Sequence, residues 1–398
     1  MQKTKSANLW IRIAVISLAF LVIAGFLVSQ ALSKRINHDE NQYIACAELI
    51  GEGYVPYHDF LYFHLPYLPY IYAGLFSFTD HLLLSSRIFS ALCALTYLFL
   101  IYLLVAGRFE FLSKNGAAFF AISAVFLITA TGIFRHTATL SWSHDFPIML
   151  IVLAFFLFAE FFQNDRKILL FFSGILLGTA VMARLTYIFS ILPFFLVLFA
   201  GARMRAWRNI VPRIIFLVSG FLASLLPLLI LIADRAAFEN FTYSIYDYHF
   251  RFDQIFLREM GWIPGSRLQF ELYSELFLDK LVFLPFLSVF ASIYLLIKHR
   301  KNVIAHRELL LALLIAIFSF AGTISREVAH KQYFLIIVIF LILNLYLLIS
   351  GFELFRSRLF YRVSGILILA VLLWDPSHLV HAWGRLDGGY MQEVHAQG

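Results

Sequence analysis

Long apolar runs recur along the chain, and they constrain its fold more than any other feature. The runs are about 17 to 25 residues long and are separated by short charged segments, with longer interruptions at 32–81 and 233–279. An α-helix of about 20 apolar residues spans a hydrocarbon core roughly 30 Å thick and satisfies its own backbone hydrogen bonds. The pattern therefore predicts an all-α membrane protein rather than a barrel, whose strands would alternate polar and apolar residues.

These runs predict a bundle of about eleven membrane-spanning helices. With 61% hydrophobic residues, only 14% charged residues and a mean hydropathy of +0.83, the chain is far more apolar than soluble domains, which are roughly 45 to 50% apolar. No low-complexity tract or Gly/Ser linker divides it, so we predict a single polytopic membrane domain over 1–398 and no separable soluble domain. The predicted spans are 9–31, 82–106, 115–133, 145–162, 168–183, 187–201, 210–232, 280–297, 309–324, 334–350 and 363–380.

Basic residues cluster after every second predicted span, and the positive-inside rule therefore places the N-terminus in the cytoplasm. Acidic residues show the reverse bias, so the pI near 9.3 reflects topology. The sequence has no basic stripe with interleaved aromatics, and we expect no nucleic-acid partner. The cytoplasmic clusters hold 18 of the 31 Lys and Arg residues: Lys3, Lys5, Arg12, Arg108, Lys114, Arg166, Lys167, Arg203, Arg205, Arg208, Arg213, Lys298, Arg300, Lys301, Arg307, Arg356, Arg358 and Arg362.

The two longer segments, 32–81 and 233–279, both fall on the external face in this topology. The first has a helical register from Ala45 to Ile50 followed by a Pro-rich aromatic stretch, which predicts a short interfacial helix and then either a re-entrant helix or a second interfacial helix. The second is rich in Tyr, Phe, Asp and Arg. Its residues 246–253 either stack on sugars or form a solvated surface helix with an aromatic belt.

Polar residues at the external ends of different spans converge on one face of the predicted bundle. Asp39 and Glu40 follow the first span, Asp145 opens the fourth, Arg184 follows the fifth, and 330–333 precede the tenth. A random scatter of polar residues would fall on both faces. The external face is therefore where we expect a functional site.

The first external loop resembles that of the GT-C glycosyltransferases, specifically the protein mannosyltransferase and aminoarabinose transferase branch. The resemblance is strong over 1–200 and weak beyond, and it rests on the acidic pair Asp39-Glu40, then Tyr43, then Gly53-Tyr54-Val55-Pro56-Tyr57-His58-Asp59-Phe60, and His64-Leu65-Pro66 before the second span. It implies a GT-C-type bundle in a bacterial inner or plasma membrane. It also implies transfer of a sugar, with inversion, from a polyprenyl-phosphate donor to a hydroxyl of a lipid or glycan acceptor on the external or periplasmic face.

The same resemblance implies roles for individual residues. Asp39 corresponds to the catalytic base with Glu40 as its neighbour, Arg184 to the residue that faces the carrier phosphate, and Asp145 to an acid that helps to assemble the site. A carboxylate base is worth roughly 10² to 10⁴ in rate, and an arginine holds phosphate oxygens with two parallel hydrogen bonds. A divalent cation, Mg²⁺ or Mn²⁺, bridging Asp39 and Asp145 could do the same job. Further candidates are His64, Tyr43 and Lys331 for the donor, and Tyr57, Asp59, His330 and Tyr333 for the substrates.

The chain departs from the GT-C pattern in two places. Relatives often carry a basic or small residue where Gln42 stands, and a Lys or His before a double proline where His64-Leu65-Pro66 stands. A neutral Gln compensates less of the charge of a carrier phosphate. A protonated His64 could substitute for it.

Each candidate residue also has a purely structural interpretation. Asp39 and Glu40 can cap a helix in the first loop, and Asp145 can cap the fourth span, because carboxylates favour helix N-termini. Arg184 can extend to lipid headgroups, and residues 330–333 can anchor the chain at the interface.

Two other functions compete with the transferase. A glycan polymerase or ligase also has ten to twelve spans and a large external loop. The activity of that class would depend on Arg and His residues in a late loop and would not need acids after the first span. A transporter or flippase usually buries ionisable groups near the midplane on broken helices, with repeats between its halves. Here the predicted spans carry few internal charges and the acids lie at their ends, which favours the enzyme.

Overall fold

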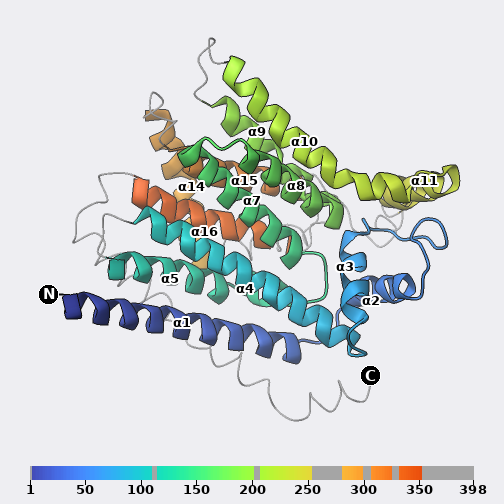
Figure 1. The fold of residues 1–398 in the computed structure, drawn as a ribbon, viewed down its shortest axis with the longest axis horizontal. Coiled ribbons are helices and arrows are strands. Elements are labelled where there is room, and N and C mark those ends of the chain that lie inside the picture. The colour runs from blue at the N-terminus through green and yellow to red at the C-terminus, as the bar shows by residue number, and fades with distance from the viewer. Residues whose placement is uncertain are drawn as a thin grey trace.

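Long helices run side by side along the longest dimension of the molecule, and the short helices of residues 38–51, 67–76 and 235–242 lie at one end of them (Figure 1). The computed structural model describes residues 2–109, 114–200, 207–252, 280–298, 306–324 and 331–351. The long helices are α1 (Gln2–Ser33), α4 (Leu82–Arg108), α5 (Lys114–Ala130), α7 (Asp145–Asn164), α8 (Ile168–Ala183), α10 (Trp207–Leu231), α14 (Lys280–Lys298), α15 (Arg307–Ile324) and α16 (Phe334–Gly351). The short elements are α2 (His38–Gly51), α3 (Tyr67–Phe76), α6 (Gly132–Thr137), η1 (Leu185–Ser190), α9 (Leu192–Phe199), α11 (Arg235–Thr242), η3 (Tyr243–Phe252) and η5 (Lys331–Tyr333).

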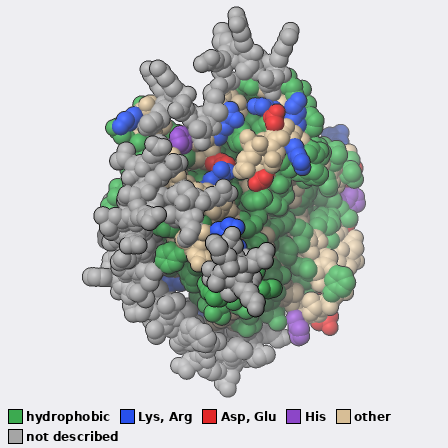
Figure 2. Space-filling view, turned by 60° about the vertical axis from the view of Figure 1, so that its left-hand side comes forward, with side chains coloured by type: hydrophobic (Ala, Val, Ile, Leu, Met, Phe, Trp, Pro, Cys, Tyr) green, Lys and Arg blue, Asp and Glu red, His purple; other side chains and the backbone are tan. Residues whose placement is uncertain are grey.

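The two ends of the bundle differ in their content. At the first-loop end, on the right of Figure 1, α1 ends and α2, α3 and α11 lie together. At the opposite end, which we call the basic end, α1 begins and α4, α7 and α16 end. Figure 2 brings the basic end toward the viewer and shows Lys and Arg side chains there, with Asp and Glu between them.

Within the described ranges, six helices are long and apolar enough to cross a membrane: Trp10–Ser33, Leu82–Arg108, Asp145–Asn164, Ile210–Leu231, Leu281–Lys298 and Lys331–Gly351. Lys114–Ala130, Ile168–Ala183 and Leu185–Phe199 are shorter apolar helices. The protein is therefore an integral, multi-pass, all-α membrane protein, as the apolar runs predicted. The loop between the first and second spans carries two short helices, α2 and α3.

Two predicted spans have different boundaries in the structure. The span predicted at 115–133 is interrupted at Thr131, because its hydroxyl caps α6 by accepting a hydrogen bond from the backbone N–H of Phe134. The span predicted at 187–201 begins with the 3₁₀ helix η1 and continues as α9 after Ile191. The span predicted at 363–380 lies outside the described residues, as do residues 253–279 of the segment 233–279.

Helix α16 forms the centre of the bundle, whereas α1 lies at its edge. In the spanning window of α16, 94% of the residues are buried, against 11% in α1. Polar contacts tie α16 to its neighbours: Asn344 donates to Ser288 and Ser292 on α14, at 2.8 and 3.1 Å, and Tyr346 shares a 2.7 Å hydrogen bond with Ser123 on α5. Such bonds between helices are typical of membrane bundles, where burial of apolar surface drives association only weakly.

Glycines allow α8 and α10 to approach closely. A Cβ atom added at Gly174 would lie 2.1 Å from the carbonyl oxygen of Leu217, and one added at Gly220 would lie 1.9 Å from that of Phe171. Both distances are far below van der Waals contact. The pair α8 and α10 therefore depends on residues without side chains, as small-residue interfaces in membranes do.

We expect Gly174→Ala to lower the thermal unfolding midpoint of the purified protein, because the added methyl group overpacks the α8–α10 interface by about 1 to 3 kcal/mol. The matched control is Gly25→Ala on α1, where nothing lies within 4 Å of the added atom. That change should leave the midpoint unchanged or raise it, since Ala favours a helix over Gly. Equal midpoints for the two variants would contradict the close approach of α8 and α10.

Candidate functional site

Helix α2 begins directly after the first span and is capped by residues other than Asp39. The N-cap is Asn37, whose side chain accepts a hydrogen bond from the backbone N–H of Asp39 at 3.0 Å. Glu40 closes the capping box by accepting a 2.9 Å hydrogen bond from the backbone N–H of Asn37. The side chain of Asp39 is thus not required for the cap, although its charge lies favourably in the first turn.

Glu40 is fully buried and paired with Arg87 of α4. Arg87 donates from Nε and Nη2 to the two carboxylate oxygens of Glu40 at 2.9 and 2.7 Å, and the backbone N–H of Ser141 donates at 2.7 Å. Arg87 also donates to the carbonyl oxygens of Ala31, Lys34 and Arg35. This pair joins the end of α1, the start of α2, α4 and the segment before α7.

Asp39 and Tyr43 lie four residues apart and so share a face of α2. Asp39 is partly exposed, whereas Tyr43 is fully buried. Burial is the main cause that raises the pKa of Tyr43, Arg184 opposes it, and the Asp39 carboxylate adds a smaller upward contribution. The partly exposed carboxylate therefore lies beside a buried phenol that contacts a guanidinium.

Arg184 is the centre of a polar cluster built from four elements. At the end of α8, its Nη1 donates to Ser143 at 2.6 Å and to the hydroxyl of Tyr43 at 3.3 Å, and its Nη2 donates to the hydroxyl of Tyr333 at 2.6 Å. Its guanidinium carbon also lies 5.0 Å from the centre of the Tyr333 ring. Tyr43 and Ser143 are bonded to each other at 2.7 Å.

The segment between α6 and α7, residues 138–144, contributes Ser143 to this cluster and has a strained backbone. Thr139 has a φ of +70°, which is unfavourable for a β-branched residue. The buried His144 contacts the Tyr187 hydroxyl through Nδ1 at 3.0 Å and packs edge-on against the Tyr333 ring. Local strain of this kind is often found at functional sites.

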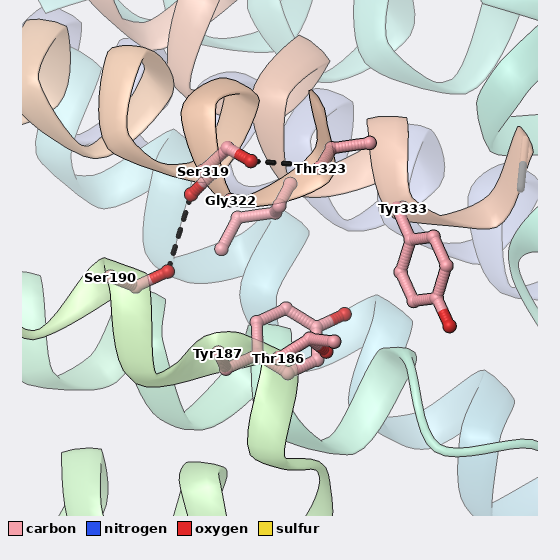
Figure 3. A pocket seen from close by; sticks show the side chains of 8 residues that line it. Thr186, Tyr187, Ser190, Ser319, Gly322, Thr323 and Tyr333 are labelled. Carbon is pink, nitrogen blue, oxygen red and sulfur yellow. Dashed lines mark hydrogen bonds between the residues drawn. The ribbon is translucent and has the colours of Figure 1, made fainter. Parts of the chain in front are cut away.

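A pocket adjoins the cluster between η1, α15 and α16 (Figure 3). It is small, about 20 Å³, which is room for little more than one water molecule, and it is lined by Thr186, Tyr187, Ser190, Ser319, Gly322, Thr323, Tyr333 and Ile336. Ser190 and Ser319 bond across it at 3.2 Å. Tyr333 belongs both to the pocket and to the Arg184 cluster, so the two are continuous. Phe189 covers Gly322, because a Cβ atom there would lie 2.4 Å from its ring.

Asp145, at the start of α7, is fully buried and faces protein donors. Its carboxylate accepts from the backbone N–H of Thr139 at 2.7 Å and from the Tyr97 hydroxyl at 3.2 Å. Lys34 interacts electrostatically with it and donates to the carbonyl oxygen of Ala138. Burial lowers the pKa of Lys34, and Asp145 partly offsets that effect.

A metal bridge between Asp39 and Asp145 fits this arrangement poorly. Both oxygens of Asp145 already accept hydrogen bonds, and the neighbouring Lys34 would oppose a divalent cation. Among the residues that the structure describes, no group of three or more His, Cys, Asp and Glu could hold a metal ion. We therefore derive no catalytic step through a metal.

The remaining first-loop candidates lie beside the cluster or farther out. His64 stacks on the Tyr43 ring at 5.3 Å and contacts Gln42 at 3.2 Å. Tyr57 is buried with a φ of +68°, and Asn240 donates to its carbonyl oxygen at 2.8 Å. Asp59 closes its own turn by accepting from the backbone N–H of Val55, and its hydrogen bond with His58 is the main cause that lowers its pKa.

The structure brings Tyr43, Arg184 and Tyr333 together, with His64 and Asp39 close by. Lys331 begins η5, two residues before Tyr333, and His330 lies outside the described residues. Three participants were not predicted: Arg87, Ser143 and Tyr187. Arg87 had a usable signal, since a charge six residues into an apolar span needs a partner. Ser143 and Tyr187 had none, because neutral hydroxyls occur throughout the chain.

Fold and site thus define a polytopic membrane protein with a polar cluster at one end of its helical bundle. No known family profile and no curated protein matches the sequence. The structure is similar to crystal structures of ArnT from Cupriavidus metallidurans, bound to undecaprenyl phosphate (13% identity, TM-score 0.58, 92% of this chain and 65% of that one) and in the apo state (16%, 0.57, 94% and 65%). It is also similar to the Archaeoglobus fulgidus oligosaccharyltransferase in complex with Zn and sulfate (17%, 0.58, 92% and 53%).

These similarities show that the chain shares the fold of ArnT and of the oligosaccharyltransferase, which is the fold implied by its resemblance to GT-C glycosyltransferases. The chain spans 65% of the length of ArnT and 53% of the length of the oligosaccharyltransferase.

Proposed function

We propose that the protein is a membrane glycosyltransferase. It transfers a sugar from a polyprenyl-phosphate donor to a hydroxyl of a lipid or glycan acceptor, with inversion at the anomeric carbon. The fold and the bound undecaprenyl phosphate of ArnT support the class of donor. The basic clusters support a cytoplasmic N-terminus, which puts the Arg184 cluster on the external face.

The observation that carries the proposal is the uncompensated positive charge of Arg184. Its hydrogen-bond partners are the hydroxyls of Tyr43, Ser143 and Tyr333, and no carboxylate of the described residues forms an ion pair with it. A partly buried guanidinium surrounded by neutral hydroxyls favours binding of an anion, and arginine suits phosphate oxygens in particular. Lys331 and His64, which lie near Tyr333 and Tyr43, are the further donor contacts that we propose.

Asp39 is the proposed general base. Its carboxylate takes the proton from the acceptor hydroxyl as the new glycosidic bond forms, while the bond between the anomeric carbon and the phosphate oxygen breaks. Arg184 stabilises the negative charge of the departing polyprenyl phosphate. Glu40 acts as a positioning residue, because its carboxylate is occupied by Arg87 and two backbone N–H groups.

The pocket beneath Tyr333 is proposed to border the part of the donor next to its phosphate, because about 20 Å³ is too small to enclose it. It joins the Arg184 cluster through Tyr333, and the hydroxyl-bearing residues Thr186, Ser190 and Ser319 line it. Tyr57, Asp59 and His330 remain candidates for contacts to the substrates, and Asp145 for holding the segment before α7.

We expect Arg184→Ala to raise KM for the lipid-linked donor by roughly 10- to 100-fold, because a hydrogen bond to a charged group contributes about 1.5 to 3 kcal/mol. Arg184→Lys should have an intermediate effect, since lysine keeps the positive charge but cannot donate two parallel hydrogen bonds to the phosphate. The measurement is transfer from a radiolabelled polyprenyl-phosphate sugar by purified protein in detergent.

The matched control for Arg184 is Arg235→Ala, which removes an arginine that is 92% exposed at the same end of the bundle. It should leave KM unchanged. An unchanged KM in Arg184→Ala would overturn the assignment of the phosphate site. Since detergent sustains no gradient, absence of any product release or transfer would favour a transporter instead.

A further inference from the structure

Two arginines at the basic end stack on neighbouring rings of α7. The guanidinium carbon of Arg213, on α10, lies 5.2 Å from the centre of the Phe161 ring, and that of Arg307, at the start of α15, lies 4.7 Å from Phe162. The two ring centres are 5.4 Å apart. Both guanidinium groups therefore lie over adjacent rings of one helix, and their positive charges oppose each other.

Most donors of these two guanidinium groups have no protein acceptor in the described ranges. Arg307 forms no hydrogen bond or ion pair with another described residue, although its Nε is buried. Arg213 donates from Nη2 to Asp165 at 2.9 Å, but its buried Nε likewise has no acceptor among the residues described. Buried donors of charged groups are normally satisfied, so these atoms indicate a missing acceptor.

The carboxylates around the pair are engaged elsewhere or reach water. Glu308 pairs with Arg108, and Glu160 accepts a 3.1 Å hydrogen bond from Asn164. Asp165 is 70% exposed and contacts Arg213 alone of the two arginines. The described acids therefore leave a net positive charge between α7, α10 and α15.

We propose that Arg213 and Arg307 bind the phosphate of an anionic membrane lipid in the leaflet at the basic end. A phosphate placed between the two guanidinium groups would accept from the unsatisfied N–H groups and relieve the repulsion between them. A lipid is favoured over a free anion because α10 borders the membrane: only 22% of the residues in its spanning window are buried. The site is separate from the Arg184 cluster, which lies at the other end of the bundle.

The test compares full-length proteins in nanodiscs of phosphatidylcholine alone and of phosphatidylcholine mixed with phosphatidylglycerol. The variants are Arg213→Gln, Arg307→Gln and the double variant, and native mass spectrometry counts the retained phosphatidylglycerol. The control is Lys298→Gln, which removes a cation at the same end that also lies over a ring, 5.8 Å from the centre of Tyr294. Inorganic phosphate is tested separately in phosphatidylcholine discs.

For the wild type and Lys298→Gln, phosphatidylglycerol should raise the unfolding midpoint and be retained by the protein. The double variant should lose at least about tenfold in affinity for it, since each charged hydrogen bond contributes about 1.5 to 3 kcal/mol. Retention that is equal in all variants would overturn the proposal, as would an equal shift from inorganic phosphate alone. If the double variant does not fold, the two single variants decide, because each should retain less phosphatidylglycerol than Lys298→Gln.

Discussion

Asp39→Asn is expected to reduce glycosyl transfer by roughly 10² to 10⁴-fold, which is the usual contribution of a general base. The substitution keeps the size of the side chain but removes its ability to take a proton from the acceptor. The helix should remain intact, because Asn37 and Glu40 provide the cap of α2. The loss should therefore appear in kcat, with little change in KM for the donor or in the unfolding midpoint.

The matched control for Asp39 is Glu48→Gln, which neutralises an exposed carboxylate farther along the same helix. It should retain full activity. Raising the pH should not rescue Asp39→Asn, since an amide has no proton to lose. Transfer at the wild-type rate would refute the role of Asp39, whereas loss of donor binding together with kcat would indicate that Asp39 contributes to the site by charge alone.

The bundle could be predicted from the sequence because each long helix in a membrane must be apolar and must satisfy its own backbone. The predicted boundaries were least accurate where a helix breaks inside an apolar run. At Thr131 the break depends on local capping, in which the Thr131 hydroxyl accepts from the backbone N–H of Phe134, and the apolar run carries no signal for it. At Ile191 a signal was present, because Pro193 lies in the first turn of α9.

The meeting of candidate residues at one end of the bundle could be predicted because the ends of antiparallel helices lie on one face. Tyr43, Arg184 and Tyr333 come from distant parts of the chain and share hydrogen bonds in the structure. The sequence could not predict which member of the acidic pair is buried in an ion pair and which is partly exposed. Asp39 and Glu40 are adjacent and chemically alike, and only the position of Arg87 on α4 shows which of them is buried in an ion pair.

Arg87→Ala is expected to lower the free energy of unfolding by about 3 to 5 kcal/mol, because it leaves the buried carboxylate of Glu40 without its partner. The junction of α1, α2 and α4 should loosen, since Arg87 also holds three carbonyl oxygens at the end of α1. Thermal unfolding in detergent measures the loss. The exposed pair Arg235 and Glu239, at the same end, is the control, and breaking it should change stability by less than about 1 kcal/mol.

A double-mutant cycle separates the positioning role of Glu40 from a catalytic one. If Glu40 only positions, Arg87→Ala combined with Glu40→Ala should destabilise by less than the sum of the single changes, since removing the second charge relieves the first. Transfer activity should then follow the folded fraction in all three variants. If instead Glu40→Gln lowers kcat while its unfolding midpoint stays at the wild-type value, Glu40 takes part in the chemistry and the positioning role is wrong. We expect the positioning role, because the Glu40 carboxylate already accepts four hydrogen bonds and has no lone pair left for a substrate proton.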